Sequence, residues 1–282
     1  MIQAGTITYD TMKEATALRL TILLATLVFA ATLLGIAYNH IYQDGEWFKA
    51  QYFGQDVFTM FIILPLLVIS AQQGLNNNVS AWRMIFLSIL LYLIYVYAIF
   101  VFAAEFSPLY FLHLPIFSLS LFIMLSLLGC FFISRRKMLM PGRSLRLAAA
   151  AYLILIAAML ATLWLNDLLR HTFTEGHASG TPDGKPLLII YSMDLGVIIP
   201  LMLIGAIGLL LNRSKGIAWS GIMLVKSTLM SFALLAMSMS MYWNGLEPDT
   251  FLVGLWSILG VAGLIITILY MNRMQDALPD NQ

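Results

Sequence analysis

Two ionisable side chains lie inside long apolar segments of this sequence and are the first candidates for chemistry. They are Asp194 and Lys226. An ionisable group in hydrocarbon costs several kcal/mol unless it is paired or hydrated, so each marks a candidate site. Asp194 is suited to binding a cation, carrying a proton or holding a ligand amine, or it is a structural aspartate near the interface. Lys226 is suited to pairing with a carboxylate or binding an anionic substrate. The alternative is that its long side chain extends to the inner membrane surface.

Further polar side chains lie near the ends of the same apolar segments. One interpretation groups them with Asp194 as an acidic outer vestibule, which would concentrate cations through its field; the members are Asp56, Glu105, His113 and Asp167. The simpler expectation is that Asp56, Asp167 and Glu105 are solvated near the membrane interface and that His113 bonds to a neighbouring helix. Tyr95 shares a helix face with Tyr92, where it either lines a cavity or packs with a satisfied hydroxyl.

Two prolines lie at matching places inside apolar segments. Pro65 follows Ile62-Ile63-Leu64, and Pro200 follows Val197-Ile198-Ile199. A proline removes a backbone donor and clashes with the carbonyl four residues earlier. In a membrane, that carbonyl must find another partner or line a cavity. A matched pair of interrupted helices therefore points to a binding site, although a structural kink is the simpler reading.

The elements that hold these residues follow from composition. The chain has 282 residues, of which 61% are hydrophobic and 10% charged, and its mean hydropathy is +0.88. A soluble fold of this size is excluded, because too few polar side chains exist to cover its surface. The single cysteine, Cys130, excludes a disulfide scaffold, and a net charge of +1 argues against a nucleic-acid partner. The expected partner is the lipid bilayer.

Eight stretches have the roughly 20 apolar residues that a spanning helix needs, and none alternates like a barrel strand. The predicted spans are Leu18–Tyr38, Val57–Gly74, Trp82–Ala104, Leu109–Ile133, Leu145–Arg170, Leu187–Leu211, Ile217–Trp243 and Phe251–Met271. The fold class is therefore an all-α integral membrane protein with eight transmembrane helices. Asp194 and Lys226 would enter the membrane from opposite faces, so direct pairing between them is not expected.

Basic residues set the orientation. Eleven Lys and Arg residues fall on the side that holds both termini, among them Arg135, Arg136 and Lys137, whereas three fall on the opposite side. Acidic residues such as Glu175 and Asp183 lean toward that opposite side. The positive-inside rule then places both termini in the cytoplasm. The expected location is a bacterial cytoplasmic (inner) membrane, in which the chain is a multi-pass protein.

The pattern of spans and loops repeats after four spans. The collinear matches are Leu18–Leu20 with Leu145–Leu147, Ile62–Leu67 with Val197–Met202, and Ala81–Trp82 with Ala218–Trp219. They predict a 4+4 duplication with halves 1–140 and 141–282, in one compact membrane domain. An even number of spans per half makes the repeats parallel. The alternative is that similar apolar helices align by composition alone.

Three functional classes remain. The first is a transporter or channel for a small solute or ion, with a site between the halves formed by Asp194, Pro200, Pro65, His113, Lys226, Asp56 and Tyr95. The second is a non-transporting protein that regulates or assembles a membrane partner or forms a homo-oligomer. The third is a membrane enzyme or a metal or haem carrier, which would use His113 or the methionines Met237 and Met241. No catalytic motif occurs, and no cofactor is predicted.

Overall fold

The computed structural model describes residues 2–76, 79–133, 141–173, 181 and 187–274. Within these ranges every regular element is a helix and no strand occurs. The α-helices are α1 (Ile2–Ala37), α2 (Glu46–Phe58), α3 (Leu64–Ala71), α4 (Ser80–Phe102), α5 (Tyr110–Ile133), α6 (Arg143–Phe173), α7 (Leu188–Met193), α8 (Ile199–Leu210), α9 (Ser214–Trp243) and α10 (Thr250–Arg273). A 3₁₀ turn forms at η1 (Asn39–Ile41), and π-helical turns form at η2 (Thr59–Ile63), η3 (Gln72–Asn76) and η4 (Asp194–Ile198). The positions Arg135–Lys137, Glu175, Asp183 and Lys185, which entered the charge argument, lie outside the described residues.

Eight helical segments of the described chain are long and apolar enough to cross a membrane, as the sequence predicts. Large apolar side chains stay exposed along their outward faces, such as Phe61, Phe122 and Ile258. This pattern is typical of a polytopic membrane protein, whose outer surface meets lipid rather than water. The second span begins at Glu46 instead of Val57. Its first three turns carry polar residues, and these lower the hydropathy below what identifies a span.

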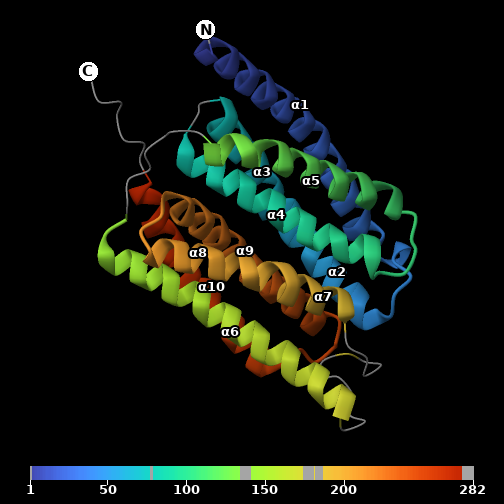
Figure 1. Ribbon diagram of the computed structural model, residues 1–282. Coiled ribbons are helices and arrows are strands. Elements are labelled where there is room, and N and C mark those ends of the chain that lie inside the picture. The colour runs from blue at the N-terminus through green and yellow to red at the C-terminus, as the bar shows by residue number, and fades with distance from the viewer. Residues whose placement is uncertain (1, 77–78, 134–140, 174–180, 182–186, 275–282) are drawn as a thin grey trace.

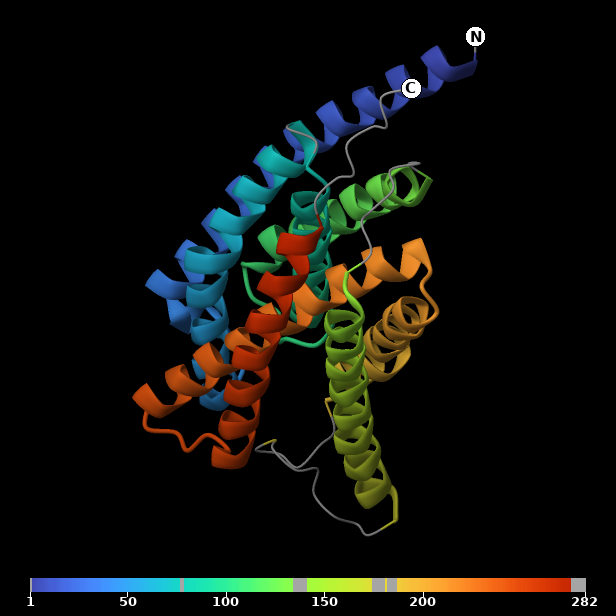
Figure 2. The same cartoon turned by 90° about the vertical axis from the view of Figure 1, so that its left-hand side faces the viewer.

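The helices form two groups that lie against each other (Figures 1 and 2). In the first group α5 packs against α1 and α4, and α3 packs against α1 and α4. In the second group α8 and α10 pack against α9, and α6 packs against α8. The groups meet where α9 packs against α2 and α4. The start of α1 and the end of α10 lie toward the same end of the bundle (Figures 1 and 2).

Pro65 and Pro200 each follow a π-helical turn by two residues. The turn η2 ends at Ile63, and η4 ends at Ile198. A proline in a helix leaves one carbonyl without its partner, and a wider π turn absorbs the clash without ending the helix. Both interrupted spans therefore continue across the membrane as bent rather than broken helices.

A glycine brings the two groups of helices together. A β-carbon at Gly54 of α2 would lie 2.7 Å from the α-carbon of Met237 on α9 and would also overlap the carbonyl of Ala236. Only a residue without a side chain allows α2 and α9 to approach this closely.

We therefore expect Gly54→Ala to lower the stability of the protein. The added methyl group must separate two backbones, and overpacking of this kind costs about 1–3 kcal/mol. Gly254→Ala on α10 is the matched control, because nothing lies within 4 Å of its position. Thermal unfolding in detergent should show a lower midpoint for Gly54→Ala and an unchanged or higher midpoint for Gly254→Ala. Equal midpoints would show that the contact is not tight.

Candidate functional site

A cavity of about 840 Å³ lies between the two groups of helices. Its walls come from α2 and α4 of the first group and from every helix of the second group. On α9 the lining extends from Lys226 to Tyr242. At about 1.5 Å per residue these positions are about 24 Å apart along the helix. The cavity therefore reaches from the loop before α10, which contributes Glu247 and Asp249, deep into the membrane-spanning region.

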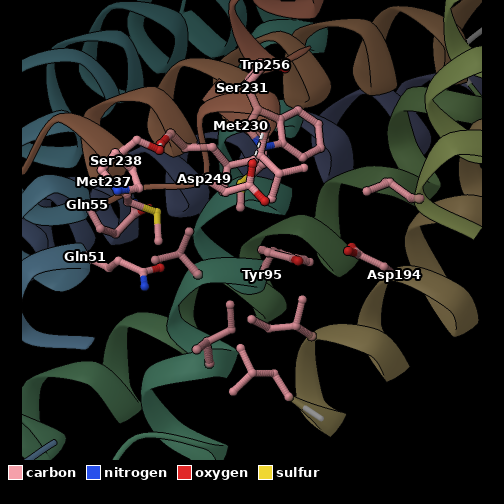
Figure 3. Close-up of a pocket in the computed structure, with 18 of the residues that line it drawn as sticks. Gln51, Gln55, Tyr95, Asp194, Met230, Ser231, Met237, Ser238, Asp249 and Trp256 are labelled. Atoms are coloured by element: carbon pink, nitrogen blue, oxygen red, sulfur yellow. Dashed lines mark hydrogen bonds between the residues drawn. The ribbon is translucent and has the colours of Figure 1, made fainter. Parts of the chain in front are cut away.

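Three side chains from three helices meet at the deep end. The hydroxyl of Tyr95, on α4, is directed at the carboxylate of Asp194 (Figure 3). The Nζ atom of Lys226 lies 4.2 Å from the centre of the Tyr95 ring. The charges of Asp194 and Lys226 also interact electrostatically. Among the described residues the two side chains form no direct ion pair, as expected, but they lie near enough for their charges to interact.

Asp194 is held by a tryptophan. The indole Nε1 of Trp164 on α6 donates a 2.8 Å hydrogen bond to Asp194 Oδ2. The Trp164 ring stacks on Tyr191 with 4.5 Å between the ring centres. Because Asp194 is the first residue of η4, the π turn that precedes Pro200 sets the position of this carboxylate. The side chain is buried, yet it lines the cavity.

Lys226 differs from Asp194 in its hydrogen bonding. Its side chain is 2% exposed and lines the cavity. Among the described residues, its ammonium contacts the Tyr95 ring and interacts with the charge of Asp194, but meets no hydrogen-bond acceptor. The neighbouring Ser227 Oγ is also buried with no hydrogen-bond partner in that part of the chain. Lys226 and Ser227 therefore present donors that meet no acceptor among the described residues.

Aromatic and polar side chains form the rest of the wall. Trp256 and Met230 lie near the deep end, whereas Gln51 and Met237 lie to the other side of Tyr95 (Figure 3). The Nε2 atom of Gln51 is buried and has no hydrogen-bond partner among the described residues. A mostly apolar wall with a few convergent polar groups is typical of a small-molecule site.

The structure brings together only some of the candidate residues. Asp194, Lys226 and Tyr95 line the cavity, whereas its lining does not include Pro65, Pro200, His113 or Asp56. The prolines lie in the spans but act on the site only through the π turns. Of the carboxylates expected to form a vestibule, only Asp194 lines the cavity, and the cavity mouth carries Glu247 and Asp249 instead.

Two carboxylates expected to be solvated are buried, so that prediction is wrong. Asp56 is 3% exposed, and its Oδ2 accepts a 2.7 Å hydrogen bond from the Tyr42 hydroxyl. Asp167 is 2% exposed and accepts a hydrogen bond from Tyr191. Burial and the Asp56 carboxylate raise the pKa of Tyr42, in the loop before α2, well above its ordinary value. Tyr42 therefore remains a donor to Asp56.

His113 and the methionines occupy different surroundings. The His113 ring is buried and packs against Phe100, Tyr97 and Tyr42, with 4.6 Å between the ring centres of His113 and Phe100. Met237 and Met241 line the cavity, whereas Met239 between them is 55% exposed. No group of three His, Cys, Asp or Glu side chains suited to a metal ion occurs among the described residues.

Sequence reasoning missed several residues of the site. Trp164 could have been found, because a tryptophan inside a span needs an acceptor for its N–H group. Gln51 was missed because it precedes the predicted second span. Ser227 has no recognisable signal, since serines in spans usually bond to their own helix.

Comparison of the chain with protein-family models, curated proteins and solved structures finds no match. An acid and a base face each other across a tyrosine at the end of a deep apolar cavity. This arrangement is suited to binding a polar group of a ligand.

We expect the charges of Asp194 and Lys226 to be energetically coupled. Removing one partner of a buried pair leaves the other uncompensated, which costs about 3–5 kcal/mol. Asp194→Asn and Lys226→Met should each lower the unfolding midpoint in detergent, and the double variant should lose less stability than the sum of the two. A double-mutant cycle measures this coupling. Strict additivity would show that the two charges act independently.

Proposed function

We propose that this chain is a transporter of a small solute that binds in the cavity between the two halves. The observation that carries the proposal is the meeting of Asp194, Tyr95 and Lys226 from three helices at the deep end of the cavity. Charged groups are rare in spans and usually line substrate paths when they face a cavity. A site deep in the membrane and lined by both halves is also typical of secondary transporters.

The two halves are best interpreted as copies of one four-helix unit. The π turn before Pro65 begins at Thr59, and the π turn before Pro200 begins at Asp194, so both features recur at the same spacing. Within each half, consecutive spans pack against each other and the last span contacts the first. Such parallel repeats are related by an axis along the membrane normal. The bias of basic residues supports cytoplasmic termini.

The cavity exists where the two halves pack unequally. The second span of the first half packs closely on α9 through Gly54. The corresponding span of the second half contacts α4 mainly through the short α7. At the position that aligns with Gly54, this span carries Ile189. A branched side chain at that position keeps the helices apart, which leaves space on the side of α6 and α10.

The end of the cavity toward the chain termini is closed by helix packing. Met84 of α4 lies directly against Gly221 of α9, and the Tyr270 hydroxyl donates a 2.8 Å hydrogen bond to the Ile217 carbonyl. The conformation is therefore open toward the loops that carry Glu247 and Asp249. Transport requires a rocking of the halves that separates α4 from α9 at Met84 and exposes the same site to the opposite side.

The test is the accessibility of a deep cavity position from both sides. Ser231 lines the cavity, so we expect Ser231→Cys, with Cys130 replaced by alanine, to react with a membrane-impermeant thiosulfonate. Sealed vesicles of both orientations should be labelled, because a transporter exposes its site alternately to each side. Mass spectrometry of the protein measures the labelled fraction.

Ser257→Cys on α10 is the matched control, since this serine lies outside the cavity lining and bonds to the Val253 carbonyl. It should remain unlabelled in both vesicle preparations. Labelling of Ser231→Cys from one side only would contradict transport. That result would favour the second class, a membrane protein that binds a ligand or partner without moving a solute.

A further inference from the structure

The deep end of the cavity needs a hydrogen-bond acceptor. An ammonium group has three donors and no acceptor. Among the described residues, Lys226 Nζ meets a ring face and the charge of Asp194, but no acceptor atom within hydrogen-bond distance. Ser227 Oγ, on the next residue of the same lining, also has no partner there. A ligand carboxylate is an acceptor-only group and supplies what both side chains need.

The opposite side of Tyr95 offers the complementary charge. An ionised carboxylate has about four lone-pair sites on its two oxygens. The Trp164 indole uses one of them at Asp194 Oδ2, and the Tyr95 hydroxyl faces the same carboxylate. Asp194 can therefore accept a further hydrogen bond from the ligand. A ligand ammonium is the donor whose positive charge complements this carboxylate.

Charge balance selects between ligands. Lys226 and Asp194 leave the deep end neutral as a pair. A monoanion or a monocation would add one net charge to a region surrounded by hydrocarbon, which is costly. A zwitterion adds none. The exposed carboxylates of Glu247 and Asp249 at the mouth also disfavour the approach of an anion.

The shape and lining of the cavity indicate the rest of the ligand. Trp164, which bonds to Asp194, lines the cavity together with Trp256 and Met230. Aromatic and thioether groups of this kind pack well against apolar or aromatic bodies. A volume of about 840 Å³ lies in the upper range of small-molecule sites, which extends to roughly 1,000 Å³.

We infer that the cavity binds a zwitterion with an apolar body, such as an aromatic amino acid or a short apolar peptide. Its carboxylate meets Lys226 and Ser227, and its ammonium meets Asp194 on the far side of Tyr95. The inference rests on the proposed function for the place of binding and deepens it by naming the class of solute. Binding itself can be measured without transport.

The experiment uses probes that share one body and differ in charge. Phenylalanine is the zwitterion, N-acetylphenylalanine is the matched anion and phenylalaninamide is the matched cation. The same three forms of the dipeptide Phe-Phe test a longer body. Calorimetry on the detergent-purified chain measures each Kd. At least one zwitterion should bind ten-fold or more tightly than both of its blocked forms.

Variants assign each end of the ligand. Lys226→Met should remove the advantage of the zwitterion over the amide, whereas Lys226→Arg should keep it. Asp194→Asn should remove the advantage over the acetylated form. Asp56→Asn is the control, because this buried carboxylate bonds to Tyr42 outside the cavity lining and should leave every Kd unchanged. Unfolding midpoints identify variants that fail to fold. If Lys226→Met or Asp194→Asn is among them, the probe affinities of wild type and Lys226→Arg test the inference instead.

Some outcomes would overturn the inference. One is that a blocked form binds as tightly as its zwitterion. The other is that none of the six probes binds to the folded protein. Failure of the proposed function has a different signature. Zwitterion binding combined with one-sided labelling of Ser231→Cys would remove transport and keep the ligand class. Labelling of Ser231→Cys from both sides, without tighter binding of a zwitterion, would keep transport and remove the ligand class.

Discussion

The structure depends on satisfying carboxylates that are buried among apolar helices. Four aspartates of the described chain are buried, and each accepts a hydrogen bond from an aromatic side chain. The pairs are Asp44 with Tyr52, Asp56 with Tyr42, Asp167 with Tyr191 and Asp194 with Trp164. An aromatic donor suits this role, because its ring packs in an apolar environment while its polar end supplies the hydrogen bond. All four of these bonds also join different helices or a helix to a loop, so the same contacts hold the bundle together.

Lys226 is the exception to this arrangement. The aspartates are paired with donors, but the Lys226 ammonium, which lines the cavity, has the face of Tyr95 and the charge of Asp194. An attraction to a ring face is worth up to about 2 kcal/mol when desolvated, which is less than an ion loses on leaving water. The folded protein therefore retains a partly unsatisfied charge at the deep end of its cavity. A ligand that completes this hydrogen bonding gains the affinity that the protein leaves unused.

The sequence predicts the spans well, because length and hydropathy depend on each segment alone. It predicts Asp194, Lys226 and Tyr95 as candidates for the same reason, since a polar group within an apolar run is visible locally. Burial of Asp56 and Asp167 depends on which tyrosine another segment brings near, and no local pattern records this. The cavity is harder still to predict. It depends on how closely α2 approaches α9 and how far α7 stays from α4, which only tertiary packing decides.

Pro200 illustrates how a residue can matter to the site without lining it. A proline two residues after a π turn bends each of the two interrupted spans. In the first half the turn begins with Thr59, whose hydroxyl accepts a 3.0 Å hydrogen bond from Gln55. In the second half it begins with Asp194, which faces Tyr95 and the cavity. The same backbone feature thus presents a neutral, satisfied residue in one half and a charge in the other. This difference explains why two spans with the same proline and π turn contribute only one charged group to the cavity.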